Sequence, residues 1–381
     1  MGAQCAGRPV YISSVHLYLH VPFCARRCSY CDFAIAVRRE VPSDAYVDAV
    51  LREWTLWQSD PVWDVSPEVQ TIYFGGGTPS RVTPASIARI LAQVGADRPI
   101  TENAEITLEA NPDDVTFAAA TSWRAAGVNR VSLGVQSFDP AVLEWMHRTH
   151  TTGQVPLAVE ALRASGIEDL SLDLIFGLPA ALGRDWDLDL ERAFALAPEH
   201  LSLYGLTVEA HTPLGHWTDR GEVMPVDEDS YAAEFLLAHK ALGAHGYEHY
   251  EISNAGRPGY RARHNSAYWR RAPFVGLGPA AHSGMGNERR WNVREWVAYQ
   301  RLTAAGKSPL EGREFLDNTT VTLEKLYLGL RTSEGLALHQ VPGPITSQWE
   351  QAGWATEGAG RVRLTAEGWL RLDALVPSIA A

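Results

Sequence analysis

Three cysteines stand within eight residues near the start of the chain: Cys24, Cys28 and Cys31, in the run FCARRCSYC. The chain has only four cysteines in all. The C-x3-C-x2-C spacing offers three thiolate ligands on one short loop and no fourth. Three thiolates can hold three irons of a [4Fe–4S] cubane and leave the fourth iron open to a small molecule. The spacing therefore favours a cluster that takes part in a reaction.

Two other interpretations of these cysteines stay open at this point. Zinc sites usually combine two C-x2-C pairs, and bacterial ferredoxins need a fourth cysteine beside a proline; this sequence has neither pattern. A Cys3His zinc site that borrows His20 or His16 remains an alternative. So does a set of three unrelated buried thiols.

The run from Tyr18 to Cys24, YLHVPFC, followed by the other two cysteines, resembles the signature of the radical S-adenosylmethionine (SAM) superfamily. More narrowly, it is similar to oxygen-independent coproporphyrinogen III oxidases and to the related HemW heme chaperones. The resemblance implies a [4Fe–4S] cluster on Cys24, Cys28 and Cys31, whose open iron binds the amino and carboxylate groups of SAM. An electron from the cluster then splits SAM to give a 5′-deoxyadenosyl radical.

Six short apolar runs alternate with amphipathic stretches and predict the frame that carries this loop. Successive β-α units imply a parallel sheet with helices outside, and six units instead of eight indicate an α/β fold built as a partial (β/α)6 TIM-type barrel. The predicted strands are 16–20, 71–74, 105–109, 130–135, 171–176 and 201–206. The predicted helices are 43–58, with Ser43 as N-cap, then 84–94, 116–126, 154–164, 186–197 and 227–244.

Each predicted strand runs into a polar or glycine-rich segment, such as Gly75-Gly-Gly-Thr-Pro79. In β/α barrels the working residues sit at the C-terminal ends of the strands. Taken singly, such residues could equally form a tight turn, a hydrogen bond at the barrel mouth or, for tyrosines, part of the core. The resemblance implies a SAM site that comprises Tyr18, Tyr30, Gly76, Gly77, Thr78, Glu109, Gln136, Arg148, Asp173 and Gly205.

A second motif, H-N-x-x-Y-W, occurs at His264, Asn265, Tyr268 and Trp269. Imidazole is a common axial ligand of heme iron, and aromatic rings offer flat apolar surface to a porphyrin. The motif resembles one associated with the heme chaperones, which implies heme binding by these four residues. The alternative is a structural histidine. Rival ligands include His147, His150, His211 and His249.

Two features separate the chain from the oxidases that it resembles. The oxidases carry a fourth cysteine two residues after the third, where this chain has Phe33. They also carry a longer arm before the cluster, and only 23 residues precede Cys24 here. Both features favour a heme chaperone that passes heme to apo-hemoproteins such as respiratory enzymes. An oxidase and a structural zinc protein remain alternatives, and enzymatic activity is left open.

The regular alternation of predicted strands and helices ends after the sixth strand, which predicts three parts. They are a radical SAM barrel over residues 1–210, an extension with the second motif over 211–310, and a small helical, winged-helix-like domain over 311–381. The last part holds nine acidic against six basic residues, and the net charge of the chain is −12. Nucleic acid requires a basic face, so it is not an expected partner.

Few cysteines and an oxygen-labile cluster indicate a reducing compartment, so we expect a cytoplasmic protein. No apolar run approaches the 18 residues of a membrane span. Peripheral contact with a membrane and the choice between monomer and homodimer stay open.

Overall fold

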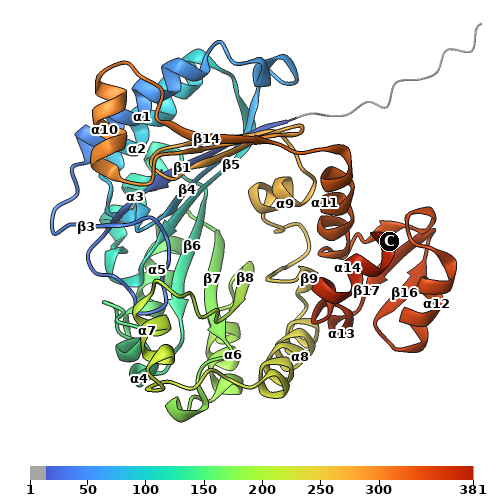
Figure 1. Cartoon of the computed structure of the whole chain (residues 1–381). Coiled ribbons are helices and arrows are strands. Elements are labelled where there is room, and N and C mark those ends of the chain that lie inside the picture. Colours follow the sequence, from blue (N-terminus) through green and yellow to red (C-terminus); the bar gives the residue numbers. More distant parts are fainter. Residues whose placement is uncertain (1–13, 381) are drawn as a thin grey trace, which may run out of the picture.

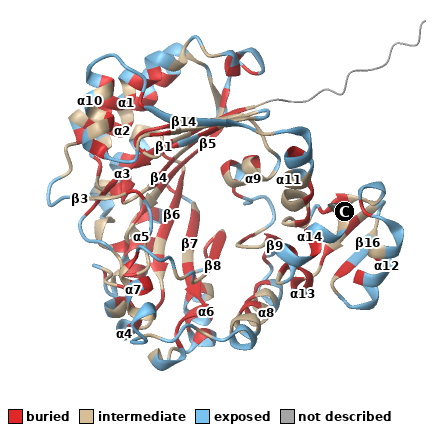
Figure 2. Cartoon of the chain, viewed as in Figure 1, coloured by how far each residue is buried: buried red, intermediate tan, exposed pale blue. Residues whose placement is uncertain are grey.

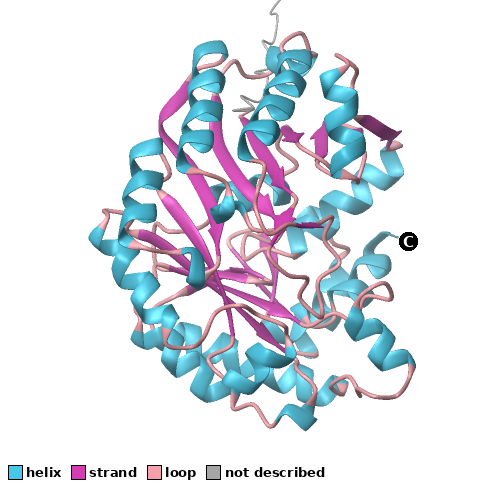
Figure 3. Ribbon diagram, turned by 90° about the vertical axis from the view of Figure 1, so that its left-hand side faces the viewer, coloured by secondary structure: helices cyan, strands magenta, loops and turns pink. Residues whose placement is uncertain are grey.

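A twelve-stranded curved sheet organises the computed structural model, which describes residues 14–380 (Figure 1). Six of its strands lie side by side and run parallel, which confirms the predicted series of β-α units. Helices cover the outer face of the sheet, so the fold is an open, partial barrel (Figure 3). The six strands are β1 (Val15–Val21), β4 (Val69–Gly76), β5 (Ile100–Ala110), β6 (Arg130–Gln136), β7 (Asp169–Phe176) and β8 (His200–Gly205).

The predicted helices between these strands are present, with ends that differ by up to three residues. They are α1 (Ser43–Trp57), α2 (Pro84–Asp97), α3 (Phe117–Ala126), α5 (Gln154–Ala164) and α6 (Trp186–Ala195); α8 (Glu228–Ala244) follows β8. The short helices α4 (Pro140–Trp145) and α7 (Pro213–Asp219) were not predicted. The prediction of Ser43 as N-cap is wrong, because Pro42 holds that position. The Ser43 hydroxyl instead accepts the backbone N–H of Thr83.

Along each strand, side chains that point outward into the hydrophobic core alternate with side chains that point into the barrel. In β1, Leu17 and Leu19 belong to the hydrophobic core that the outer helices complete, and both are fully buried. The intervening Tyr18 contacts Tyr73 of the neighbouring strand, with ring centroids 6.1 Å apart. Successive residues of a strand point to opposite faces, so the polar and aromatic side chains between the apolar ones face inward. Figure 2 shows the buried residues concentrated on the sheet and its covering helices.

The sheet extends beyond both ends of the predicted six strands. Beyond β8 lie two antiparallel strands, and β1 is flanked on its other edge by a seventh parallel strand that leads into three antiparallel ones. These strands are short and rich in glycine and charge, so periodicity did not reveal them. They are β10 (Asn254–Gly256) and β9 (Glu248–Glu251) on one side, and β11 (Phe274–Leu277), β12 (His282–Met285), β13 (Glu288–Asn292) and β14 (Leu310–Phe315) on the other.

A buried carboxylate ties α1 to this added part of the sheet. Glu53 accepts hydrogen bonds from the Gly278 N–H at 2.8 Å, from Asn292 Nδ2 at 2.6 Å and from the Tyr299 hydroxyl at 2.6 Å. Tyr299 lies in α10 (Trp296–Ala304). Burial raises the pKa of Glu53 to about 7, although the three hydrogen bonds act in the opposite direction. The first outer helix is thus anchored to segments more than two hundred residues away.

The C-terminal part packs beside the open edge of the barrel (Figure 1). It contains a β-hairpin that is part of a three-stranded antiparallel sheet and is surrounded by helices. Strand β14 crosses residue 311 and belongs to the main sheet, so we propose that the C-terminal domain begins after β14. Its elements are α11 (Asn318–Leu330), β15 (Leu336–Ala337), α12 (Gly343–Gln351), β16 (Ala355–Gly358), β17 (Arg361–Leu364), α13 (Ala366–Trp369) and α14 (Leu372–Ala380).

The search for a membrane-crossing helix is negative for the described residues: none is both long and apolar enough.

Candidate functional site

A pocket of about 490 Å³ opens at the C-terminal ends of the parallel strands. We call it the cysteine pocket. The structure brings together there every residue predicted for the cluster and for SAM except Tyr18, which lines a neighbouring pocket. Those lining residues are Cys24, Cys28, Cys31, Tyr30, Gly76, Gly77, Thr78, Glu109, Gln136, Arg148, Asp173 and Gly205.

The cysteine loop is held from two sides. Cys24 ends the short strand β2 (Phe23–Cys24), which pairs with β3 (Ala36–Val37). The Thr78 hydroxyl donates to Cys24 Sγ at 3.5 Å, and Arg148 Nη1 donates to Cys28 Sγ at 3.6 Å. Burial raises the pKa of the Cys24 thiol and raises that of Cys31 to about 11. Donors aimed at sulfur favour the thiolate form, which is the form that binds metal.

The donor set fits a cluster better than a single zinc ion. Among residues 14–380, no group of three or more His, Cys, Asp or Glu side chains is placed to hold one metal ion. A cubane instead takes one thiolate on each of three irons, so its ligands lie farther apart. His20 Nε2 donates to the Ala34 carbonyl at 2.9 Å, and His16 is hydrogen-bonded to Thr71 and Ser14. Neither histidine is free for a Cys3His site.

The glycine run lets β4 approach the cysteine loop closely. Gly76 has φ +112°, and a Cβ there would lie 2.6 Å from Cε1 of His20. A Cβ on Gly77 would lie 2.9 Å from the Phe23 carbonyl oxygen and 3.0 Å from Cys24 Sγ. Larger residues would therefore displace the loop. This close packing is the visible role of the glycines; contact with SAM remains a prediction.

Two buried carboxylates line the wall of the cysteine pocket. Glu109 accepts from the Gly76 N–H at 3.0 Å and from the Tyr73 hydroxyl at 2.8 Å, and burial raises its pKa to about 7. Burial also raises the pKa of Asp173, which accepts from the Ser132 hydroxyl at 2.9 Å. Carboxylates in such a wall can accept hydrogen bonds from an ammonium group or from ribose hydroxyls.

Cationic and amide groups complete the wall. Arg148 Nη2 donates to Asn111 Oδ1 at 2.7 Å and to the Gly134 carbonyl at 2.8 Å, which fixes the guanidinium beside the cysteine loop. Gln136 ends β6 with φ +68°, an uncommon conformation for a residue other than glycine. The pocket thus combines anionic, cationic and neutral polar groups, as a zwitterionic ligand with hydroxyls requires.

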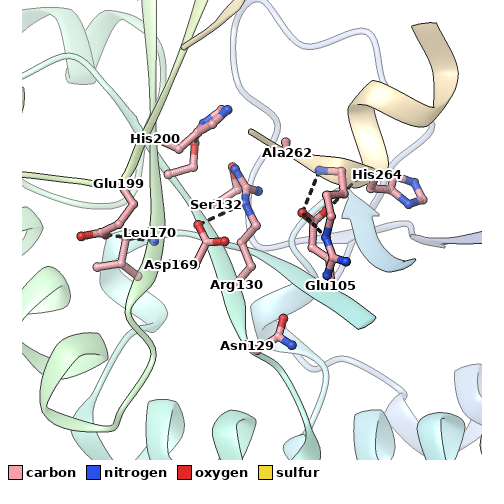
Figure 4. Close-up of polar contacts among 12 residues, drawn as sticks. Glu105, Asn129, Arg130, Ser132, Asp169, Leu170, Glu199, His200, Ala262 and His264 are labelled. Atoms are coloured by element: carbon pink, nitrogen blue, oxygen red, sulfur yellow. Dashed lines mark hydrogen bonds and ion pairs between the residues drawn. The ribbon is translucent and has the colours of Figure 1, made fainter. Parts of the chain in front are cut away.

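Helix α9 (Arg263–Trp269) carries the second motif and lies inside the barrel, away from the cysteines. Figure 4 shows its first turn held by Glu105 of β5, which accepts the backbone N–H of Arg263 at 2.8 Å and of His264 at 2.9 Å. Nearby, Arg130 and Asp169 form an ion pair of 3.4 Å. Glu105 therefore anchors the first turn of α9.

His264 is buried, with only 1% of its surface exposed, and both ring nitrogens are engaged. Nδ1 is hydrogen-bonded to the Thr71 hydroxyl at 2.6 Å and Nε2 to the Tyr268 hydroxyl at 2.8 Å. Burial holds its pKa well below the usual range. The ligation of heme iron by His264 stays a prediction; it requires one of these two hydrogen bonds to break, so that the iron can reach a ring nitrogen.

The four motif residues also do not share one cavity. Tyr268 and Trp269 line different pockets, and the Trp269 ring lies under the Arg331 guanidinium at 4.3 Å. Asn265 is partly exposed.

Of the rival histidines, His147 lines the cysteine pocket and His211 is exposed. His150 and His249 each hydrogen-bond a backbone carbonyl.

Comparison with known proteins places this site in a family. A family model described as the radical SAM superfamily matches residues 18–192. The heme chaperone HemW of Synechocystis sp. is 35% identical over 90% of this chain and 83% of its own length. HemW of Escherichia coli is 38% identical over 72% of this chain and 71% of its own length. The chain belongs to the HemW heme chaperone family.

The HemW family assignment agrees with the fold. The structure of coproporphyrinogen III oxidase from Escherichia coli, a radical SAM enzyme, superimposes with a TM-score of 0.78 over 97% of this chain and 90% of the other, at 21% identity. At that identity the likeness shows the fold alone. Membership of the radical SAM superfamily implies a [4Fe–4S] cluster and SAM, and the matched segment contains all three cysteines.

Several residues that line the cysteine pocket of this HemW relative escaped the sequence reasoning. Asn111 directly follows the end of β5, so the search for polar residues at strand ends could have included it; Ser132 lies inside β6, where that search did not look. Tyr73 and Tyr204 are aromatic residues within strands, and their types gave no signal. The unpredicted lining residues include Tyr73, Asn111, Ser132, His147, Tyr204 and Glu209.

Proposed function

We propose that this protein binds heme and transfers it to apo-hemoproteins such as respiratory enzymes, in the cytoplasm. The observation that carries the proposal is the similarity, over most of both chains, to proteins named heme chaperones. Phe33 in place of a fourth cysteine also supports it, since the resembling oxidases carry that cysteine.

In this proposal the cysteine pocket holds the resident cofactors. Cys24, Cys28 and Cys31 would ligate the [4Fe–4S] cluster, and SAM would occupy the pocket beside them. The cluster supplies an electron-transfer centre with one open iron. Arg148 can pair with the SAM carboxylate, while Glu109 and Asp173 can accept hydrogen bonds from its ammonium and hydroxyl groups. Tyr30 of the cysteine loop also lines the pocket.

Heme transfer can be tested directly. Heme-loaded protein is mixed with membranes from heme-depleted cells, and the appearance of the absorbance of respiratory cytochromes is followed in time. We expect faster reconstitution than with free hemin at the same concentration. An equal rate, or failure of the protein to bind heme, would refute the proposal.

The oxidase alternative has support from the fold and from the intact cysteine pocket. Protein with a reconstituted cluster is incubated anaerobically with coproporphyrinogen III, SAM and a reductant, and the porphyrinogen is analysed by mass spectrometry. We expect no decarboxylation while cluster and SAM are both bound. Loss of two carboxyl groups would establish the oxidase instead.

The SAM assignment predicts a specific effect of Glu109→Gln. The carboxylate that accepts from Gly76 and Tyr73 is replaced by an amide, which can accept only through its oxygen. The hydrogen bond proposed between the Glu109 carboxylate and SAM is charge-assisted, and its loss costs roughly 1.5–3 kcal/mol of binding free energy. The affinity for SAM should therefore fall about tenfold or more. Calorimetric titration of cluster-loaded protein measures this affinity. Glu102→Gln, at an exposed position of the same strand, is the matched control and should bind SAM normally.

A further inference from the structure

A pocket of about 340 Å³ lies between α9 and the C-terminal domain. We call it the basic pocket. None of its described lining residues also lines the cysteine pocket, so the two sites are separate. One wall comes from residues 250–270, and the other comes from β15, β17 and α11, which Figure 1 shows beside α9. The volume falls within the range of about 300–1,000 Å³ that is usual for ligand sites.

Positive charge dominates the walls of the basic pocket, although the whole chain carries a net charge of −12. Five basic residues and one acidic residue line it, which leaves an excess of four positive charges. Like charges gathered around one hollow repel each other and attract an anion, which relieves that repulsion. The charged residues are Arg261, Arg263, Arg270, Lys325, Arg361 and Glu334.

Two of these cations are compensated by carboxylates that do not line the pocket. Arg261 Nη2 lies 3.2 Å from a carboxylate oxygen of Glu248, and Arg263 Nε lies 3.9 Å from one of Glu105. Arg263 also donates to the Asn103 carbonyl. Because these contacts neutralise and fix both side chains, the charge that a ligand can use comes from the other three cations.

The remaining three cations have no ion pair among residues 14–380. Arg361 donates only to backbone carbonyls, that of Glu334 at 2.6 Å and that of Gly335 at 2.8 Å. Arg270 and Lys325 are exposed, and neither side chain has a hydrogen bond within the described part of the chain. Three positive charges against the single carboxylate of Glu334 leave a surplus of two, which matches the charge of a phosphate group.

The wall on the side of the C-terminal domain is firmly built. Gly335 has φ +64°, and a Cβ there would collide with the Val362 carbonyl oxygen, so only glycine lets this turn lie against β17. The turn supplies the carbonyls that hold the Arg361 guanidinium. Gln340 accepts the Ala337 N–H through its side-chain oxygen at 2.9 Å, which leaves its amide nitrogen to donate to a ligand.

A phosphate group suits the basic pocket better than a carboxylate does. Its oxygens point in several directions and carry up to two charges, whereas a carboxylate offers two oxygens in one plane and a single charge. A guanidinium can bind phosphate in bidentate fashion, and an ammonium binds it as a point charge. Tyr250 and Trp269 also line the pocket, and their rings offer apolar surface to the rest of a ligand.

We propose that the basic pocket binds a small molecule through a phosphate or diphosphate group, which Arg270, Lys325 and Arg361 hold. Arg270 directly follows α9, whereas Lys325 lies in α11 and Arg361 in β17. The ligand therefore bridges the barrel extension and the C-terminal domain and stabilises their contact. This site goes beyond heme transfer and does not depend on that function.

The test uses inorganic pyrophosphate as the probe. Full-length, cluster-loaded protein with SAM bound, so that the open iron is occupied, is titrated calorimetrically at physiological ionic strength, and the cluster absorbance is followed in parallel. We expect Arg270→Gln and Lys325→Gln each to weaken binding at least about tenfold. The controls Arg124→Gln and Lys307→Gln replace exposed basic residues elsewhere and should bind like wild type. Saturating pyrophosphate should raise the melting temperature of wild type by a few degrees, and less in the two pocket variants.

Four outcomes would overturn the proposal. Wild type that fails to bind pyrophosphate at physiological ionic strength has no built phosphate site. Equal affinity in the pocket variants and in wild type places the binding elsewhere. Citrate that binds as tightly as pyrophosphate shows that charge alone is recognised. Sedimentation with phosphatidylglycerol vesicles that Arg270→Gln abolishes, without binding of pyrophosphate, assigns the pocket to a lipid headgroup instead of a small molecule.

Discussion

Replacing Cys28 with alanine is expected to abolish the iron–sulfur cluster. Among the described residues these three cysteines supply every thiol that lines the pocket, and Cys28 accepts the hydrogen bond from Arg148. With two thiolates left, a cubane has too few protein ligands to be retained. After anaerobic reconstitution, we expect the brown absorbance and the bound iron to fall to background, and SAM binding to fall with them.

Cys5→Ala is the matched control for this experiment. Cys5, the fourth cysteine of the sequence, lies outside the described residues and apart from the C-x3-C-x2-C run, so we expect its replacement to leave the iron content unchanged. Retention of a full cluster in Cys28→Ala would contradict the ligand assignment. Zinc in place of iron in anaerobically purified wild type would revive the zinc alternative.

The second large effect concerns stability. Glu53→Leu should lower the free energy of unfolding by about 3 kcal/mol, because the buried donors of Gly278, Asn292 and Tyr299 lose their common acceptor. Urea unfolding followed by tryptophan fluorescence measures the change. Arg52→Gln, one residue away on the exposed side of α1, should change stability by less than about 0.5 kcal/mol. Equal stability of Glu53→Leu and wild type would mean that the network does not anchor α1.

The same residue predicts a dependence of stability on pH. In the folded protein the pKa of Glu53 is raised from 4.5 to about 7 by burial, so between these values the native state binds more protons than the unfolded state. The free energy of unfolding must then fall as pH rises through this window. The contribution of Glu53 is complete below about pH 4.5 and lost above about pH 7. In Glu53→Gln, which cannot titrate, unfolding measured from pH 5.5 to 8 should show a flatter slope; an identical slope would rule out this titration.

The sequence was informative wherever a local pattern determines the structure. Alternating β-α segments predicted six parallel strands, and polar residues at strand ends predicted the walls of the cysteine pocket, because parallel strands bring their C-terminal ends to one edge. Strands β11 to β14 escaped because they are short and carry glycine and charge. Their pairing depends on contacts between residues far apart in the chain, such as Leu17 with Val275.

The second motif shows a different limit. Its residue types suit heme, but residue types do not reveal which way a histidine points. Glu105, 159 residues away, fixes the first turn of α9 so that His264 faces Thr71 inside the barrel.

The position of β1 between β4 and β11 has a consequence for folding during synthesis. The strand that leads into the cysteine loop leaves the ribosome long before one of its partners, Phe274–Leu277, which is made hundreds of residues later. Until then β1 presents an unpaired edge, the kind of surface that recruits other chains. A fragment cut to the matched segment, residues 18–192, keeps every cysteine of the loop but never receives that partner. We expect such a fragment to aggregate during expression, so the smallest unit able to mature its cluster extends past β11.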